Sequence, residues 1–210
     1  MLPLETLDAL DLTLWLGSEV VAAQRLSCSQ STVSRRLTMA LKVFGAKLVR
    51  RDGQLELAES CPLLTMQREV HQLARLLGHG QLRLELDHGV ARDLLGEMHS
   101  HCCVGCAGGM GRGRRLNFLR ERLVDGWLAS KTAELPGNDD TTFQVFVLAQ
   151  PPFEGATNPT SDLNGCLAVV VRSDVATSPA TVQLLSVLSN ALKVQGPSHG
   201  QLTRVDCVMP

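Results

Sequence analysis

The first sixty residues change hydrophobic period once, and that change constrains the fold of this chain more than any other feature. Apolar residues recur every three or four positions over 4–16, 19–26 and 30–43, which predicts three helices. The spacing then becomes alternating over 48–57, centred on Asp52-Gly53. Asp-Gly between two short alternating runs is a strong hairpin signal. Three short helices followed by a hairpin are the layout of a winged helix-turn-helix.

Turn and capping residues support these boundaries. Gly17-Ser18 separates the first two predicted helices, and Gly45 ends the third. Ser18 and Ser29 stand where a helix N-cap is expected, so the third helix opens at Ser29-Gln30-Ser31. Small residues at Ala22-Ala23 allow two helices to cross closely.

A fourth amphipathic helix is predicted after Pro62, within the segment 61–80. Its apolar stripe has no obvious place in the small core formed by the first three helices. Such a stripe suggests a dimer seam, although packing against the following segment is the alternative. The stripe consists of Leu63, Met66, Val70, Leu73 and Leu77.

Beyond residue 80, predicted strands alternate with predicted helices, which is typical of a small α/β domain. Strands are expected at 81–86, 143–148 and 167–171, with a possible short one at 202–207. Helices are expected at 88–101, at 116–128 and, capped by Ser178, at 179–192, and a glycine-rich basic loop at 104–115.

Composition limits the possible classes of protein. No apolar run reaches about 18 residues, so no membrane-spanning helix is expected. The amino terminus lacks the pattern of a signal peptide, and seven cysteines are an odd number for a disulfide framework. We therefore expect a cytoplasmic protein without membrane contact.

Net charge does not by itself indicate a nucleic-acid partner. The chain carries a formal charge of -1, and its first sixty residues hold as many acidic as basic side chains. A basic domain is the usual electrostatic footprint of DNA binding. Any DNA binding must therefore depend on where the charges lie.

The run AAQRLSCSQSTVSRRL at 22–37 resembles the signature of LysR-type transcriptional regulators. The following Phe44-Gly45 and KLVRR at 47–51 resemble the end of the recognition helix and the wing of that family. The resemblance implies a winged helix-turn-helix DNA-binding domain at 1–60 and a linker and dimerisation helix at 61–80. It also implies a periplasmic-binding-protein-like α/β effector domain at 81–210.

The resemblance and the helix periodicity agree on which residues face DNA. Val33, Leu37 and Leu41 occupy the buried face of the third helix, and the opposite face is polar. The amino-terminal end of such a helix enters the major groove, and wing arginines contact phosphates. The alternatives are plain surface residues and, for Ser29, a helix cap alone. The candidate DNA-binding residues are Gln30, Ser31, Thr32, Ser34, Arg35, Arg36, Arg50 and Arg51.

The segment 81–210 departs from the family in length, because it is too short for two full lobes. We expect one lobe to be missing or much reduced. This puts the small-molecule cleft of the family in doubt, so an effector is left open and no cofactor is expected.

Histidine and cysteine gather between residues 99 and 106, and the spacing of Cys103 and Cys106 is that of a zinc knuckle. His99 and His101 are candidate partners in a metal site. Redox sensing is a second possibility, in which nearby arginines lower a thiol pKa. A third is that these are small buried cysteines beside a glycine loop. The arginines concerned are Arg112, Arg114 and Arg115.

Three functions have to be weighed against the sequence. The leading one is a sequence-specific transcriptional regulator that binds double-stranded DNA as a homodimer or larger oligomer. The alternative is a degenerate regulator that serves as a protein-interaction and dimerisation module without inducer sensing. An enzyme is not expected, because the sequence shows no nucleophile with a base and no carboxylate pair at a telling spacing.

Overall fold

The computed structural model describes residues 3–87, 102–105, 110–130, 135–137, 139–148 and 167–195. The chain divides into two compact units. Unit 1 comprises Met1–Ala74 together with Glu121–Leu123, and unit 2 comprises Arg75–Arg120 and Val124–Pro210. The domain boundaries expected near residues 60 and 80 stay a prediction.

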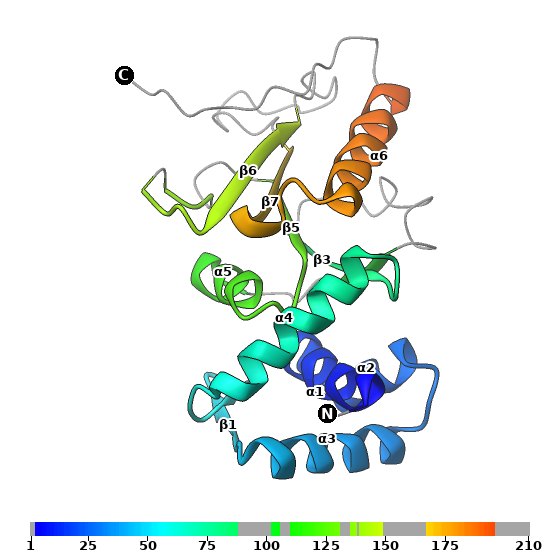
Figure 1. Ribbon diagram of the computed structural model, residues 1–210, viewed down its shortest axis with the longest axis vertical. Coiled ribbons are helices and arrows are strands. Elements are labelled where there is room, and N and C mark those ends of the chain that lie inside the picture. The colour runs from blue at the N-terminus through cyan, green and yellow to red at the C-terminus, as the bar shows by residue number, and fades with distance from the viewer. Residues whose placement is uncertain are drawn as a thin grey trace, which may run out of the picture. The chain divides into compact units, whose positions relative to one another are not determined.

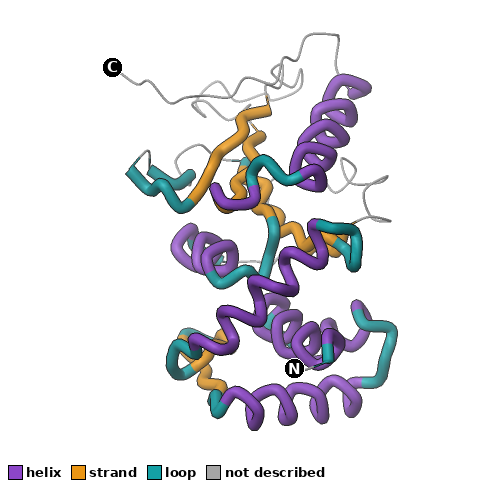
Figure 2. The backbone as a smooth tube through the Cα atoms, viewed as in Figure 1, coloured by secondary structure: helices purple, strands orange, loops and turns teal. Residues whose placement is uncertain are grey.

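Unit 1 begins with three helices and an antiparallel strand pair, followed by a fourth helix (Figure 2). Each predicted element in this part is present, with ends within about one residue of those expected, except that the fourth helix ends at Leu76 and not near Gly78 or Gly80. The elements are α1 (Leu4–Leu16), α2 (Glu19–Arg25), α3 (Gln30–Phe44), β1 (Leu48–Arg51), β2 (Gln54–Leu57) and α4 (Pro62–Leu76), whose last two residues belong to unit 2.

Left-handed residues set the ends of these elements. Gly17 and Gly45 follow α1 and α3 with φ values of 71° and 62°, a conformation that glycine adopts without steric cost. Asp52 and Gly53 both have positive φ, 51° and 77°, as a type I′ hairpin turn requires. The turn therefore fixes the pairing of β1 with β2.

The core of unit 1 surrounds α1, which is buried on every side. Leu7, Leu10 and Trp15 are almost wholly buried, and Val33 and Leu37 of α3 pack in the same core. Burial on all sides also encloses the carboxylate of Asp11, which is 1% exposed. The periodicity of the sequence did not predict this buried charge.

Unit 2 is built on a five-stranded sheet with the order β4-β3-β5-β7-β6 (Figure 1). The strands β4, β3 and β5 are parallel, and β7 runs antiparallel to both β5 and β6. The strands are β3 (Leu82–Leu86), β4 (Cys102–Gly105), β5 (Gly126–Ala129), β6 (Phe143–Leu148) and β7 (Leu167–Arg172).

Helix α6 (Pro179–Gln195) runs beside this sheet and closes an aliphatic core (Figure 1). Leu188 of α6 and Leu84 and Val169 of the sheet are fully buried in that core. Ser178 caps the helix as predicted, since its Oγ accepts a hydrogen bond from the amide of Thr181 at 3.2 Å.

Two sequence predictions in unit 2 are wrong. The expected helix at 116–128 is α5 (Arg112–Arg120) followed by a turn and β5, because Arg122 takes a left-handed φ of 60°. The expected loop at 104–115 contains the end of β4 and the start of α5. A four-residue strand such as β4 is specified by its pairing with β3, which no local pattern reveals.

Some predicted elements lie outside the described residues, namely the helix at 88–101 and the strand at 202–207. Within the described part of the chain, no helix has the length and apolarity needed to cross a membrane.

Candidate nucleic-acid interface

The amino-terminal turn of α3 is closed by hydroxyl groups. The Oγ of Ser29 accepts a hydrogen bond from the amide of Thr32 at 3.2 Å, which makes Ser29 the N-cap. The same oxygen lies 2.9 Å from the hydroxyls of Ser31 and Thr32. The turn therefore presents a fixed group of hydroxyls beside the free amides of a helix start, which favour an anion.

Arg35 is folded back onto this turn. Its Nε donates to the carbonyl of Ser31 at 3.3 Å, and its Nη2 donates to Oγ1 of Thr32 at 3.4 Å. These contacts orient the guanidinium before any ligand binds, so less side-chain freedom has to be lost on binding. The sequence predicted an outward Arg35 but not this orientation.

Exposure along α3 agrees with the predicted faces. Gln30, Ser31 and Arg35 are exposed, whereas Thr32, Ser34 and Arg36 are half-buried. Ser31 and Arg35, four residues apart, therefore lie on the outward face, whereas Gln30 is exposed as the first residue of the helix, three residues before the buried Val33. Which of these six side chains touches DNA stays a prediction.

The hairpin separates its two arginines. Neighbouring residues of a strand point to opposite faces, so Arg50 and Arg51 leave β1 in different directions. The Nη1 of Arg50 donates to the carbonyl of Gly53 at 3.0 Å, across the turn. Both side chains are exposed, but a single surface laid against one face of the hairpin would meet only one of them directly.

Helix α4 exposes the whole apolar stripe identified in the sequence. The five side chains follow one another at intervals of three and four residues, the spacing of a coiled-coil seam. Their exposed fractions are 66% for Leu63, 66% for Met66, 58% for Val70, 55% for Leu73 and 65% for Leu77. Core packing within the described chain therefore does not account for this stripe.

The opposite side of α4 carries a buried arginine that the sequence analysis missed. The Nε of Arg68 lies 2.8 Å from Asp11 of α1, and its Nη1 lies 2.7 Å from Glu121. Arg122 contacts the same helix, with hydrogen bonds to Glu69 and Gln72. In the sequence, the only sign of this buried contact is that Arg68 and Asp11 are charged residues at helix positions whose neighbours on the same face are apolar.

The predicted histidine and cysteine site is only partly within the described residues. His99, His101 and Cys106 lie outside them, and the described residues contain no group of three or more potential metal ligands. Burial raises the pKa of the Cys102 thiol to about 11, with smaller contributions from Asp125 and Cys103. For Cys102, this raised pKa does not favour the redox interpretation, in which nearby arginines lower a thiol pKa.

The nearby arginines are engaged elsewhere in unit 2. The guanidinium of Arg115 lies 3.1 Å from the carboxylate of Asp87 and 5.6 Å from the ring centroid of Trp127. That of Arg114 lies 5.2 Å from the ring of Phe118. The contacts of Arg115 therefore link α5 to the sheet, whereas the contact of Arg114 lies within α5.

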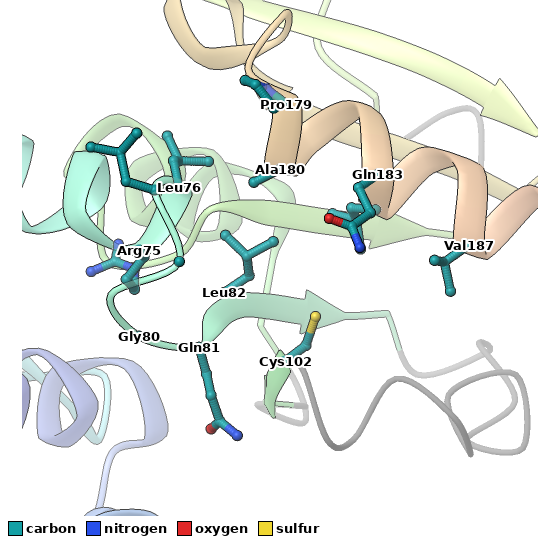
Figure 3. Close-up of a pocket in the computed structure, with 13 residues that line it drawn as sticks. Arg75, Leu76, Gly80, Gln81, Leu82, Cys102, Pro179, Ala180, Gln183 and Val187 are labelled. Carbon is teal, nitrogen blue, oxygen red and sulfur yellow. The ribbon is translucent and has the colours of Figure 1, made fainter.

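Unit 2 also contains a pocket of about 440 Å³ near the start of α6 (Figure 3). Its walls include Leu82, Cys102 and, from α6, Gln183 and Val187. Arg75 lines it too, but its Nε and Nη2 each lie 2.8 Å from the carboxylate of Asp125. The pocket is therefore largely uncharged in character.

No protein-family model and no curated protein sequence matches the chain. Several solved structures do match the chain. A full-length OxyR variant from Pseudomonas aeruginosa is 12% identical, covers 92% of this chain and 98% of its own, and has a TM-score of 0.50. CrgA, a LysR-type transcriptional regulator from Neisseria meningitidis, is 16% identical over 89% of this chain and 98% of its own, with a TM-score of 0.33. At these identities the likeness to the OxyR variant shows a shared fold alone.

Proposed function

We propose that the chain is a DNA-binding transcriptional regulator of the LysR type. In this proposal, α1, α2, α3 and the β1–β2 hairpin are a winged helix-turn-helix, and α3 reads base edges in the major groove. The observation that carries the proposal is the start of α3, where exposed Gln30 and Ser31 stand beside a pre-oriented Arg35.

Each of these groups has a natural partner in DNA. The carboxamide of Gln30 can pair with an adenine edge, and the guanidinium of Arg35 with guanine O6 and N7. The helix start and the hairpin arginines suit phosphates, which position the protein without specifying sequence. Because the first sixty residues carry almost no net charge, binding to DNA would depend on where these polar and charged groups lie.

A second copy of the chain is the proposed partner for the α4 stripe. An exposed seam of five large apolar residues is costly in water, and pairing two such seams would bury both. A dimer would also place two copies of α3 to read two half-sites on one face of DNA.

A reduced effector domain is the corresponding proposal for unit 2. The described residues of unit 2 form one sheet, and β6 and β7 are neighbours in it although residues 149–166 separate them in sequence. A single lobe would lack the cleft between two lobes, so no small-molecule effector is proposed.

Selection of bound sequences from random DNA by the full chain tests the function. We expect a short consensus arranged as a palindrome, with affinity that falls steeply as salt rises. Arg35→Ala should weaken binding about 5- to 150-fold and relax one base position, since a bidentate base contact is worth about 1–3 kcal/mol. Arg51→Ala should weaken all sequences alike and lower the salt slope by about one.

Arg112→Ala is the matched control, because it removes an exposed arginine from unit 2. It should leave DNA affinity within about twofold, as expected for a charge that contacts no phosphate. A random pool that yields no consensus, from a chain that still self-associates, would favour the alternative of a protein-interaction module.

A further inference from the structure

The exposed side chains of α3 change from wholly polar to mixed along the helix. Its first half exposes the polar side chains Gln30, Ser31 and Arg35. Its second half exposes the polar Thr38 and Lys42 and also two large apolar side chains, Met39 at 52% and Val43 at 57%. Helix packing in unit 1 therefore leaves both of them largely in contact with solvent.

Neighbouring side chains do not cover Met39. Arg35, one turn earlier, folds toward the start of the helix, where it bonds to Ser31 and Thr32. Thr38 donates its hydroxyl to the carbonyl of Ser34 at 2.9 Å, so that hydrogen is used within the helix. Met39 is thus an accessible apolar contact beside an oriented arginine.

The major groove offers one apolar group for such a side chain. Thymine presents its C5-methyl there, whereas the other base edges present hydrogen-bond donors and acceptors. Met39 lies four residues after Arg35, about 6 Å further along the helix axis, on the same side of the helix.

We propose that Met39 is a specificity-determining residue that contacts the methyl group of a thymine in each half-site. The inference rests on the proposed function, because it requires α3 to lie in the major groove. It adds to that function a hydrophobic contact at a base that Arg35 does not reach. The expected half-site then contains a guanine and, at another position, a thymine.

Replacement of thymine by deoxyuridine tests this contact, since it removes only the methyl group and leaves base pairing intact. The DNA is a duplex from the random selection, with one half-site thymine exchanged at a time. One exchange should weaken binding by the wild-type chain about fourfold, because burial of one methylene-sized group is worth about 0.8 kcal/mol.

Met39→Ala should bind the thymine duplex several-fold more weakly and should no longer distinguish thymine from deoxyuridine at that position. Val20→Ala is the matched control, since Val20 is similarly exposed, at 49%, but lies on α2. It should retain the full deoxyuridine penalty. Both side chains are largely exposed, so thermal melting should show both variants folded.

The possible outcomes distinguish the proposed role of Met39 from the proposed DNA-binding function. A wild-type chain that selects a consensus but shows no deoxyuridine penalty overturns the role of Met39 and leaves the DNA-binding function standing. A penalty that persists undiminished in Met39→Ala also overturns it, because another residue then reads the methyl. Failure to select any consensus removes the function, and the inference with it.

Discussion

The two units differ in how many of their large apolar side chains are exposed to solvent. Among the described residues, unit 1 leaves eight of them exposed: Leu4, Val20, Met39, Val43, Leu63, Met66, Val70 and Leu73. In unit 2 the corresponding residues are Leu77, Val182 and Val187. Four of the residues in unit 1, namely Leu63, Met66, Val70 and Leu73, form a continuous stripe with Leu77 of unit 2. Because a continuous apolar surface marks contact with partners, a partner is expected to bind along this stripe, most of which belongs to unit 1.

Buried charges, by contrast, are paired within both units. In unit 2, Asp125 accepts bonds from Arg75 and from the amide of Arg83. In unit 1, Arg68 contacts the carboxylates of Asp11 and Glu121. The two units therefore differ in their exposed apolar side chains and not in how they pair buried charges.

The largest expected effect comes from breaking a buried pair in unit 2. Asp125→Ala leaves the Arg75 guanidinium buried without its carboxylate, which should lower the free energy of unfolding of unit 2 by about 3–5 kcal/mol. Each unit contains one buried tryptophan, Trp15 or Trp127, so in a Trp15→Phe background the emission reports unit 2 alone. Urea unfolding followed by that emission measures the loss.

Asp174→Ala is the control for this measurement. Asp174 is 43% exposed in its pair with Arg172, so its removal should cost less than about 1 kcal/mol. Equal losses in the two variants would contradict the view that unit 2 depends on its buried pairs.

A charge in the α4 stripe tests the partner surface of unit 1. Val70→Asp should raise the dimer dissociation constant by about 30-fold or more, since a central interface residue is worth about 2 kcal/mol or more. Sedimentation equilibrium measures this constant. Val182→Asp, at a similarly exposed valine of unit 2, should leave it unchanged; the reverse ranking would move the interface to unit 2.

The cap of α3 gives a smaller effect that is confined to unit 1. Ser29→Ala removes the acceptor for the Thr32 amide and should cost about 1 kcal/mol of unfolding free energy. Ser29→Asp should restore stability, because aspartate caps as well as serine. Its carboxylate should nevertheless weaken DNA binding by repelling phosphate, so the two readouts should separate; a Ser29→Asp protein with full DNA affinity would place phosphates elsewhere.

The smallest effect at neutral pH concerns the Cys102 thiol. Its pKa is raised from 9.0 to about 11, so the folded state favours the neutral thiol. The resulting stabilisation is complete below pH 9 and is lost as pH rises from about 9 to about 11. Stability of unit 2 measured across that range should fall less in Cys102→Ala, and alkylation of Cys102 should stay slow at pH 7. Rapid alkylation there would restore the redox interpretation.

Sequence patterns predicted unit 1 well because its boundaries are set locally. Gly17, Gly45 and the Asp52-Gly53 turn each determine an element end without help from distant residues. The faces of α3 followed from periodicity for the same reason. The orientation of Arg35 did not, because it depends on two hydrogen bonds whose geometry the sequence does not encode.

Distant pairings account for what the sequence could not predict. A helical spacing is shared by Leu116, Leu119, Leu123 and Trp127. Trp127 nevertheless belongs to strand β5, which forms by pairing with β3 and β7. Asp11 and Arg68 are 57 residues apart, so the sequence around either residue does not predict the ion pair between them. Periodicity cannot distinguish such cases from local structure.

The short segment Glu121–Leu123 has a practical consequence for dissecting the molecule. It belongs to unit 1 although the chain on both sides of it belongs to unit 2. A fragment cut after Ala74 would keep Arg68 but lose Glu121, one of its two carboxylate partners. Unit 1 is therefore not a module that a single cut can release, and a faithful fragment would need residues 121–123 supplied again, as a tethered peptide.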